Sequence, residues 1–153
     1  MEEDRIQKAV ELFKSGYNCS QSVVAAFADM YGFTQEQALR MGASFGGGIG
    51  RMRETCGAAC GMFLVAGLET GATEATDREG KAANYAVVQE LAAEFKKRNG
   101  SLICAELLGL KKKEPVSTIP EERTAQYYSK RPCAKMVEEA ARIWVEYLEK
   151  HPK

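Results

Sequence analysis

The sequence from Gly46 to Gly61 reads GGGIGRMRETCGAACG, with six glycines, two arginines and two cysteines in sixteen residues. Glycines at this density let a backbone turn without a Cβ penalty or come close to a neighbouring group. The apolar run from Met62 to Leu68 follows directly, so we expect a helix here, with Thr55 as its cap. We interpret the stretch as one wall of a cysteine-based redox or metal site.

Apolar residues recur at helical spacing on both sides of this stretch, and no period-two run typical of a strand interrupts them. Asn18 with Gln21, and Thr34 with Gln37, have the spacing of capping boxes. The expected helices cover residues 3–15, 18–31, 34–45, 55–71, 76–99, 101–108, 121–129 and 132–148. The sequence therefore predicts an all-α fold, a single-domain helical bundle of about five to seven helices over residues 1–153.

Some details of this bundle follow from the same periodicity. Thr76 is expected to cap the longest helix, and Pro132 to occupy the first position of the last. Residues expected to be buried by the second and the longest helix are Val23, Val24, Phe27, Met30, Ala82, Tyr85, Val88, Leu91 and Phe95. Tyr127 and Tyr128 are expected to pack in the interior.

The composition argues against binding to nucleic acid or to a membrane. Lys and Arg total 21, as do Asp and Glu, so no overall charge attracts nucleic acid or an anionic membrane. The longest apolar run is too short to span a bilayer, and the acidic start of the chain does not resemble a secretory signal. We therefore expect a cytoplasmic protein with neither nucleic acid nor membrane as partner. Five cysteines in that reducing compartment are more often functional than structural.

Four cysteines, each in the first turn of a different expected helix, are the main candidates for function: Cys19, Cys56, Cys104 and Cys133. Unpaired N–H groups and the helix dipole favour a thiolate at such positions, which lowers the pKa of the thiol. Positive side chains that would add to this effect are Arg51, Arg53, Lys130 and Arg131. The alternative is that each cysteine is a small buried hydrophobe. Cys60, one turn beyond Cys56, is expected to pack, with a role as resolving thiol as its alternative.

This pattern resembles the C_GCAxxG_C_C family, for which redox activity is proposed. The segment Cys56-Gly57-Ala58-Ala59-Cys60-Gly61 matches the family's Cys-Gly-Ala-x-x-Gly motif, with Cys60 in a variable position, and the other three cysteines follow the family order. Members are often encoded beside transporters and oxidoreductases, so the resemblance implies a redox-partner protein. A related domain in split-Soret cytochromes carries an iron–sulfur centre, so the resemblance also implies cluster binding as an alternative.

Two functions compete for the four cysteines. In the first, two or more of them cycle between thiol and disulfide, which needs no cofactor. No C-x-x-C pair is present, so a disulfide would join distant segments, such as Cys19 with Cys56 or Cys104 with Cys133. In the second, the same four sulfurs bind an iron–sulfur cluster or another metal. The only histidine, His151, lies near the end of the chain, so any metal would be held mainly by sulfur.

A third hypothesis assigns the glycine-rich segment to a ligand. Backbone N–H groups at Gly47, Gly48 and Gly50, with the Arg51 side chain, could hold an anion. No expected strand precedes this segment, so it matches neither the dinucleotide fingerprint nor the P-loop. The structural alternative is a glycine turn that lets two helices approach closely. The sequence leaves the substrate, the redox partner and the oligomeric state open, and a homodimer through an apolar helix face is compatible with it.

Overall fold

The computed structural model describes residues 2–110, 117–130 and 132–152, and within these ranges the secondary structure is helical. Two short 3-10 turns, Ala28–Tyr31 and Ala43–Phe45, accompany the α-helices. The α-helices are α1 (Glu2–Lys14), α2 (Cys19–Phe27), α3 (Gln35–Gly42), α4 (Gly57–Thr70), α5 (Arg78–Asn99), α6 (Cys104–Leu107), α7 (Ala125–Lys130) and α8 (Cys133–Lys150). The all-α fold is confirmed. The described residues form eight α-helices, slightly more than the five to seven expected.

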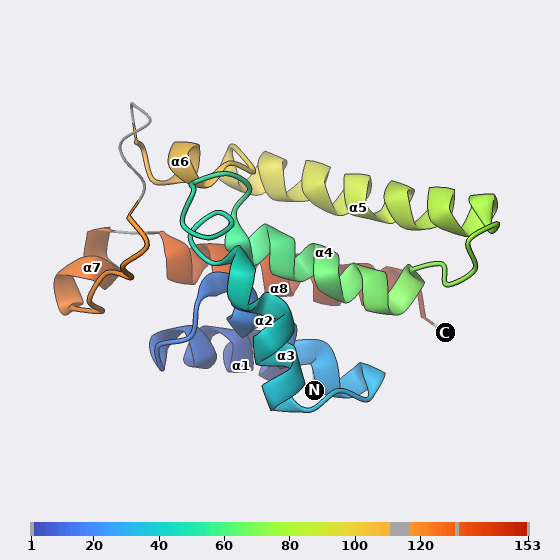
Figure 1. Ribbon diagram of the computed structural model, residues 1–153, viewed down its shortest axis with the longest axis horizontal. Coiled ribbons are helices and arrows are strands. Elements are labelled where there is room, and N and C mark those ends of the chain that lie inside the picture. Colours follow the sequence, from blue (N-terminus) through green and yellow to red (C-terminus); the bar gives the residue numbers. More distant parts are fainter. Residues whose placement is uncertain (1, 111–116, 131, 153) are drawn as a thin grey trace.

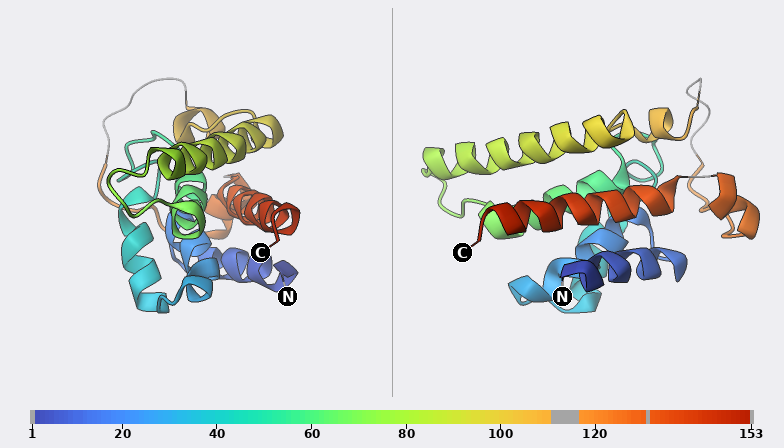
Figure 2. Two further views of the ribbon diagram at one scale, coloured as in Figure 1. Left: turned by 90° about the vertical axis from the view of Figure 1, so that its right-hand side faces the viewer. Right: turned by 180° about the vertical axis from the view of Figure 1, so that it is seen from behind.

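Helix α2 is the centre of the bundle and packs against α1, α3, α4 and α8. Helices α4 and α8 begin at the same end of the molecule, and α5 runs back toward that end, where α6 and α7 also lie (Figure 1). Figure 2 shows α5, α8 and α1 stacked along one side of the molecule. The largest side chains of the core are fully buried: Trp144, Phe13, Phe27 and Phe95.

Capping boxes start α2 and α3 as the sequence predicts. The Asn18 side chain accepts from the Gln21 N–H at 2.9 Å, and the Gln21 side chain accepts from the Asn18 N–H at 3.0 Å. Thr34 and Gln37 exchange the same two hydrogen bonds. A cap of this kind stabilises a helix by about 1 kcal/mol. Both boxes are local in sequence, which is why spacing alone identifies them.

Two helix glycines let neighbouring backbones approach α2 closely. A Cβ on Gly61 of α4 would lie 2.9 Å from the Ser20 carbonyl oxygen. A Cβ on Gly42 of α3 would lie 2.8 Å from the Gln21 nitrogen. Real Cβ atoms do not approach other atoms so closely, so a larger residue at either position would push the helices apart. The close approach of helices therefore depends on Gly61, from the motif, and on Gly42, which precedes it.

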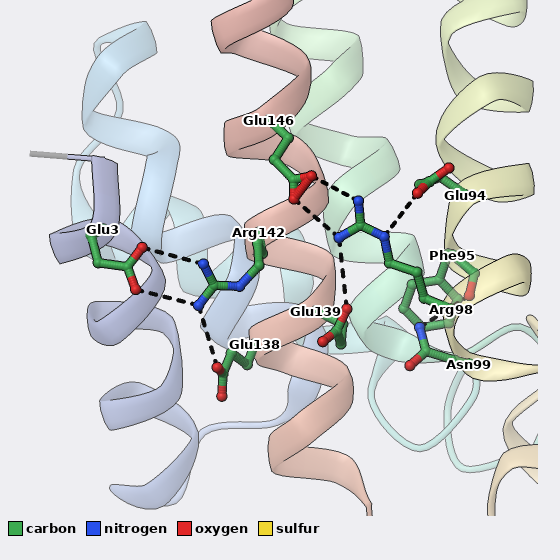
Figure 3. A network of polar contacts seen from close by, with 9 residues as sticks. All are labelled: Glu3, Glu94, Phe95, Arg98, Asn99, Glu138, Glu139, Arg142 and Glu146. Carbon is green, nitrogen blue, oxygen red and sulfur yellow. Dashed lines mark hydrogen bonds and ion pairs between the residues drawn. The ribbon is translucent and has the colours of Figure 1, made fainter.

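Ion pairs link α8 to α1 and to α5 (Figure 3). Arg142 of α8 faces Glu3 of α1 at 3.3 Å, and Arg98 of α5 faces Glu146 of α8 at 2.7 Å. The Arg98 guanidinium also contacts Glu94 at 2.9 Å. Such pairs at partly exposed positions contribute about 0–1 kcal/mol each. The buried apolar side chains therefore contribute more to holding α8 in place.

Three of the burial predictions are wrong. Tyr85 is 61% exposed, Ala82 is exposed and Met30 is 40% exposed, whereas the expected burial of Leu91 and Phe95 is found. Helix α5 packs mainly on α4 and α8, and its first turns extend past the core, which leaves their outer side to solvent.

The cap of α5 is Asp77, not Thr76, because the Asp77 side chain accepts from the Gly80 N–H at 2.8 Å. Among the described residues, no helix combines the length and the apolar character needed to cross a membrane.

Candidate functional site: a cavity lined by four cysteines

A cavity of about 440 Å³ lies at the end of the molecule where α4 and α8 begin. Its lining includes the four cysteines that the sequence singles out: Cys19, Cys56, Cys104 and Cys133. The glycine-rich segment forms another part of the wall, with Gly46, Gly47, Gly48 and Gly50. The structure therefore brings together four residues that are spread over more than one hundred positions of the chain.

Each of these cysteines lies at a helix start, although the caps differ from those expected. Cys19, Cys104 and Cys133 are the first residues of α2, α6 and α8, and Cys56 is itself the N-cap of α4. The N-cap of α4 is Cys56 and not Thr55, and α6 begins at Cys104 and not at residue 101. Pro132 is the N-cap of α8 and not its first residue. These small shifts do not move the cysteines away from the helix starts.

The glycine-rich segment has an unusual backbone. Gly47, Gly48 and Gly50 have positive φ, which glycine adopts at no cost. Three residues with side chains adopt the same left-handed region: Ile49 at φ 65°, Arg51 at 63° and Arg53 at 63°. This conformation is unfavourable for L-residues and rarest for β-branched ones such as Ile49. Strain of this kind concentrates at functional sites, which supports a role for this segment at the cavity.

Close contact with Cys104 explains why position 48 is glycine. A Cβ on Gly48 would lie 2.6 Å from the Cys104 Cβ and 2.8 Å from the Arg53 Cα. Cys56 and Cys104 are held on neighbouring segments, because Thr55 and Ile103 form an antiparallel bridge. The Cys56 N–H donates to the Leu102 carbonyl at 2.6 Å, and the Cys104 N–H donates to the Glu54 carbonyl at 2.6 Å. Sequence reasoning missed this bridge, since a single residue pair leaves no periodic pattern.

The Arg51 side chain closes one side of the cavity. Its guanidinium donates to the Ser117 carbonyl at 2.8 Å and to the Ile119 carbonyl, and lies 3.5 Å from a Glu121 carboxylate oxygen. The Gly50 and Arg51 N–H groups donate to the Ser44 and Gly46 carbonyls. These two N–H groups are therefore committed to the turn. Anion binding by Gly47, Gly48, Gly50 and Arg51 stays a prediction, in which the arginine side chain matters most.

A chain of polar contacts joins Cys19, Cys133 and Tyr127. Cys19 and Cys133 share a side-chain hydrogen bond, which is the main reason that the pKa of the Cys19 thiol is raised well above its usual value. Burial raises the pKa of Tyr127 to about 12, and its hydrogen bond with Cys133 acts in the same direction. Cys133 therefore contacts both Cys19 and Tyr127, and both cysteines are half-buried.

Tyr127 packs against the core as expected, but sequence reasoning missed its contact with Cys133. Its neighbour Tyr128 also packs, with its ring at 6.1 Å from that of Phe13 in an edge-on arrangement. Arg123 lies over the Phe13 ring at 4.2 Å and near the Tyr127 ring at 5.2 Å. Tyr127 follows no motif, so the sequence carries no signal that separates it from Tyr128.

The expected lowering of thiol pKa values is wrong for Cys56 as well as for Cys19. Burial raises the pKa of Cys56 to about 12, although the N–H groups of Ala58 and Ala59 act in the opposite direction. The cost of burying a thiolate thus exceeds the stabilisation that a helix start supplies. Of the positive groups expected nearby, Arg53 lies with its Nη1 3.7 Å from the Cys104 sulfur. Arg131 and the side chain of Lys130 lie outside the described residues.

Cys60 differs from the other four cysteines. It is not part of the cavity lining, and its thiol donates to the Thr55 carbonyl at 3.8 Å. Burial raises its pKa to about 11. These contacts support the packing role that we expected from its position.

All five cysteines are free thiols in the structure. Within the residues that the structure describes, no three side chains of the His, Cys, Asp and Glu type are grouped closely enough to hold a metal ion. The four cavity cysteines nevertheless have the donor chemistry that iron–sulfur clusters and zinc require.

The fold and the cavity define a helical protein with four thiols around one small-molecule-sized space. The family described as "Putative redox-active protein (C_GCAxxG_C_C)" matches residues 17–147. The chain belongs to this family. Neither the curated proteins nor the solved structures gave a match to the chain.

Proposed function

We propose that the protein carries out thiol–disulfide redox chemistry, with Cys133 and Cys19 as the exchanging pair. The observation that carries the proposal is the hydrogen bond between these two half-buried thiols inside the shared cavity. We take Cys133 as the attacking group, because it contacts both Cys19 and Tyr127, and the Tyr127 hydroxyl can donate a hydrogen bond to a Cys133 thiolate. This pairing differs from the pairs Cys19–Cys56 and Cys104–Cys133 considered from the sequence.

The proposed reaction is a two-step exchange with an oxidised disulfide as co-reactant. The Cys133 thiolate attacks one sulfur of that disulfide, forms a mixed disulfide and releases one thiolate. The Cys19 sulfur, after losing its proton, then attacks the Cys133 sulfur and releases the second thiolate. The two thiol protons end on the two released thiolates. The protein is oxidised by two electrons to a Cys19–Cys133 disulfide, and the co-reactant is reduced to two thiols.

A reducing location and a redox partner suit this reaction. We propose that the protein is cytoplasmic and that a partner protein reduces the Cys19–Cys133 disulfide after each turnover. A homodimer is also compatible with the proposal, because the chemistry uses residues of one chain only.

Alkylation and mass spectrometry test the exchange. Anaerobically reduced protein should have five alkylatable thiols, and treatment with a disulfide reagent should remove two of them and join Cys19 to Cys133. The variant Cys133→Ser should lose the joined species completely, whereas Cys60→Ser, the control outside the cavity lining, should keep it. A joined pair other than Cys19–Cys133, or unchanged oxidation in Cys133→Ser, would contradict the proposal.

A second candidate is an iron–sulfur protein that uses the same four cysteines. It is favoured by the presence of all four sulfurs around one cavity, each at a helix start whose dipole offsets part of the negative charge of bound thiolates. A bound cluster would supply one-electron transfer, held by Cys19, Cys56, Cys104 and Cys133. Iron and sulfide analysis with visible spectra of anaerobically purified protein separates the two candidates. Stoichiometric iron with charge-transfer bands would favour the cluster.

A further inference from the structure

The walls of the cavity carry more positive than negative charge. In the part of the chain that the structure describes, the charged side chains of the lining are Arg51, Arg53, Arg123 and Glu121. Three guanidiniums against one carboxylate leave a formal excess of two positive charges in a chain whose overall net charge is zero. The positive ends of α4 and α8 point into the same space. An anion that enters the cavity is therefore attracted toward the cysteines.

The ion pairs with Glu121 leave N–H donors of Arg51 and Arg53 available for a ligand. Arg51 lies 3.5 Å and Arg53 3.8 Å from the same Glu121 oxygen. A direct charge-assisted hydrogen bond is shorter, roughly 2.7–2.9 Å, and a guanidinium has five N–H donors. Both arginines can thus bind a second carboxylate without losing their present partner. Arg53 also contacts the Cys104 sulfur, so an anion bound there lies next to a thiol.

The size of the cavity favours a small ligand over a protein surface. A volume of about 440 Å³ falls within the range of sites for small molecules. Thr118 and Pro120 line the cavity, and Arg51 holds the carbonyls of Ser117 and Ile119 beside them. This segment therefore borders the cavity that Cys19 and Cys133 line, and a slender disulfide fits between these walls.

We propose that the substrate of the Cys19–Cys133 pair is a low-molecular-weight disulfide that carries carboxylate groups, bound by Arg53 with Arg51. Arg123, whose guanidinium donates to the Phe13 and Tyr17 carbonyls, adds positive charge to the wall. This inference rests on the proposed thiol–disulfide function and names its substrate class. The reaction is the exchange described above, so one small disulfide yields two small thiols and the oxidised protein. The arginines orient the carboxylates, and the disulfide sulfurs lie toward Cys133.

Three disulfides of similar length and different charge test the proposal on the wild-type protein. They are dithiodiglycolate with two carboxylates, 2-hydroxyethyl disulfide with no charge, and cystamine with two ammonium groups. Each rate of Cys19–Cys133 oxidation is divided by the rate at which the same disulfide oxidises free 2-mercaptoethanol. At low salt we expect the normalised rate for dithiodiglycolate to exceed that for cystamine by at least about tenfold, and the ratio to shrink at about 0.5 M salt.

Equal normalised rates, or faster reaction with cystamine, would overturn the anionic substrate while the exchange function stands. Failure of all three disulfides to join Cys19 to Cys133 would overturn the exchange function and this inference together. The variant Arg53→Gln should lower the ratio of the normalised rates for dithiodiglycolate and cystamine by about threefold or more. Arg53→Lys keeps the charge and should lower this ratio less. Arg40→Gln removes the same charge from the exposed surface of α3 and should leave the ratio unchanged. A ratio unchanged in Arg53→Gln would contradict the role of Arg53.

Discussion

The two sides of the cavity use the same residue type at the same local position but differ chemically. On the open side, Cys19 and Cys133 are half-buried, hydrogen-bonded to each other and supported by Tyr127. On the closed side, Cys56 and Cys104 are only 5% and 8% exposed. All four lie at helix starts, so the helix dipole does not distinguish them. The comparison teaches that burial and neighbouring donors, not the helix start, decide which thiol can react.

The two sides differ in burial because backbone segments cover the cysteines of the closed side. The strained segment 46–53 folds over Cys104, and the Thr55–Ile103 bridge fixes Cys56 beside it. The open side is bordered by Tyr127 of α7 and by the start of α8. Changes to each side should therefore have separate effects, the largest on the closed side.

Substitution of Gly48 should break the closed side. In Gly48→Ala the new Cβ would meet the Cys104 Cβ at 2.6 Å and would occupy a backbone with φ 77°. We expect the free energy of unfolding to fall by about 3 kcal/mol, from overpacking together with left-handed strain. Urea denaturation measures this loss.

Gly67→Ala is the matched control for that loss. A Cβ on Gly67, in the interior of α4, meets nothing within 4 Å. Since alanine also has the higher helix propensity, this variant should be neutral or more stable by up to about 1 kcal/mol. Similar losses in both variants would show that the contact with Cys104 is unimportant.

The pH dependence of stability should report the burial of Cys56. In reduced, metal-free protein its pKa is raised to about 12 from an ordinary value of 9.0. Between these values the unfolded chain has lost the proton that the folded chain keeps, so the unfolded state binds fewer protons and stability falls as pH rises. The fall is at most about 1.4 kcal/mol per pH unit from this thiol, and it fades as the pH drops below 9.0, where the unfolded chain also keeps the proton.

Urea denaturation between about pH 8 and 10.5 measures this slope. The variant Cys56→Ser lacks the thiol and should lose less stability over the upper part of the range than the wild type. Parallel pH profiles for the two proteins would contradict a strongly raised pKa of Cys56.

Removal of the Tyr127 hydroxyl should lower the reactivity of Cys133 on the open side, and this effect is the smallest of the three. In Tyr127→Phe the Cys133 thiolate loses one hydrogen-bond donor, so less of it forms at a given pH. The remaining thiolate is more nucleophilic, which partly offsets the loss. We expect iodoacetamide to label Cys133 about threefold more slowly at pH 7.5, measured by peptide mass spectrometry.

Tyr128→Phe is the adjacent control for this change, because the Tyr128 hydroxyl donates to the Lys14 carbonyl and accepts from Arg123. Labelling of Cys133 should proceed at the wild-type rate in this variant. Equal slowing in both variants would mean that Tyr127 acts through the packing of α7 alone.

The local parts of this protein could be predicted from its sequence. The capping boxes of α2 and α3 and the end of α5 at Asn99 depend on residues within a few positions of each other. The exposure of Tyr85 could not be predicted, because it depends on whether another helix covers the outer side of α5. The contact between Tyr127 and Cys133 is likewise tertiary, and the sequence treats Tyr127 and Tyr128 alike.

By itself the sequence determined the all-α class, the helix starts near Cys19, Cys56, Cys104 and Cys133, and the need for glycine between residues 46 and 50. These are matters of backbone preference and short-range hydrogen bonding. The tertiary structure alone decided that the four thiols line one cavity, that Cys56 is held as a neutral thiol and that Cys19 contacts Cys133. Burial and long-range contacts set these properties, because a thiol's charge state depends on how much water and which donors surround it.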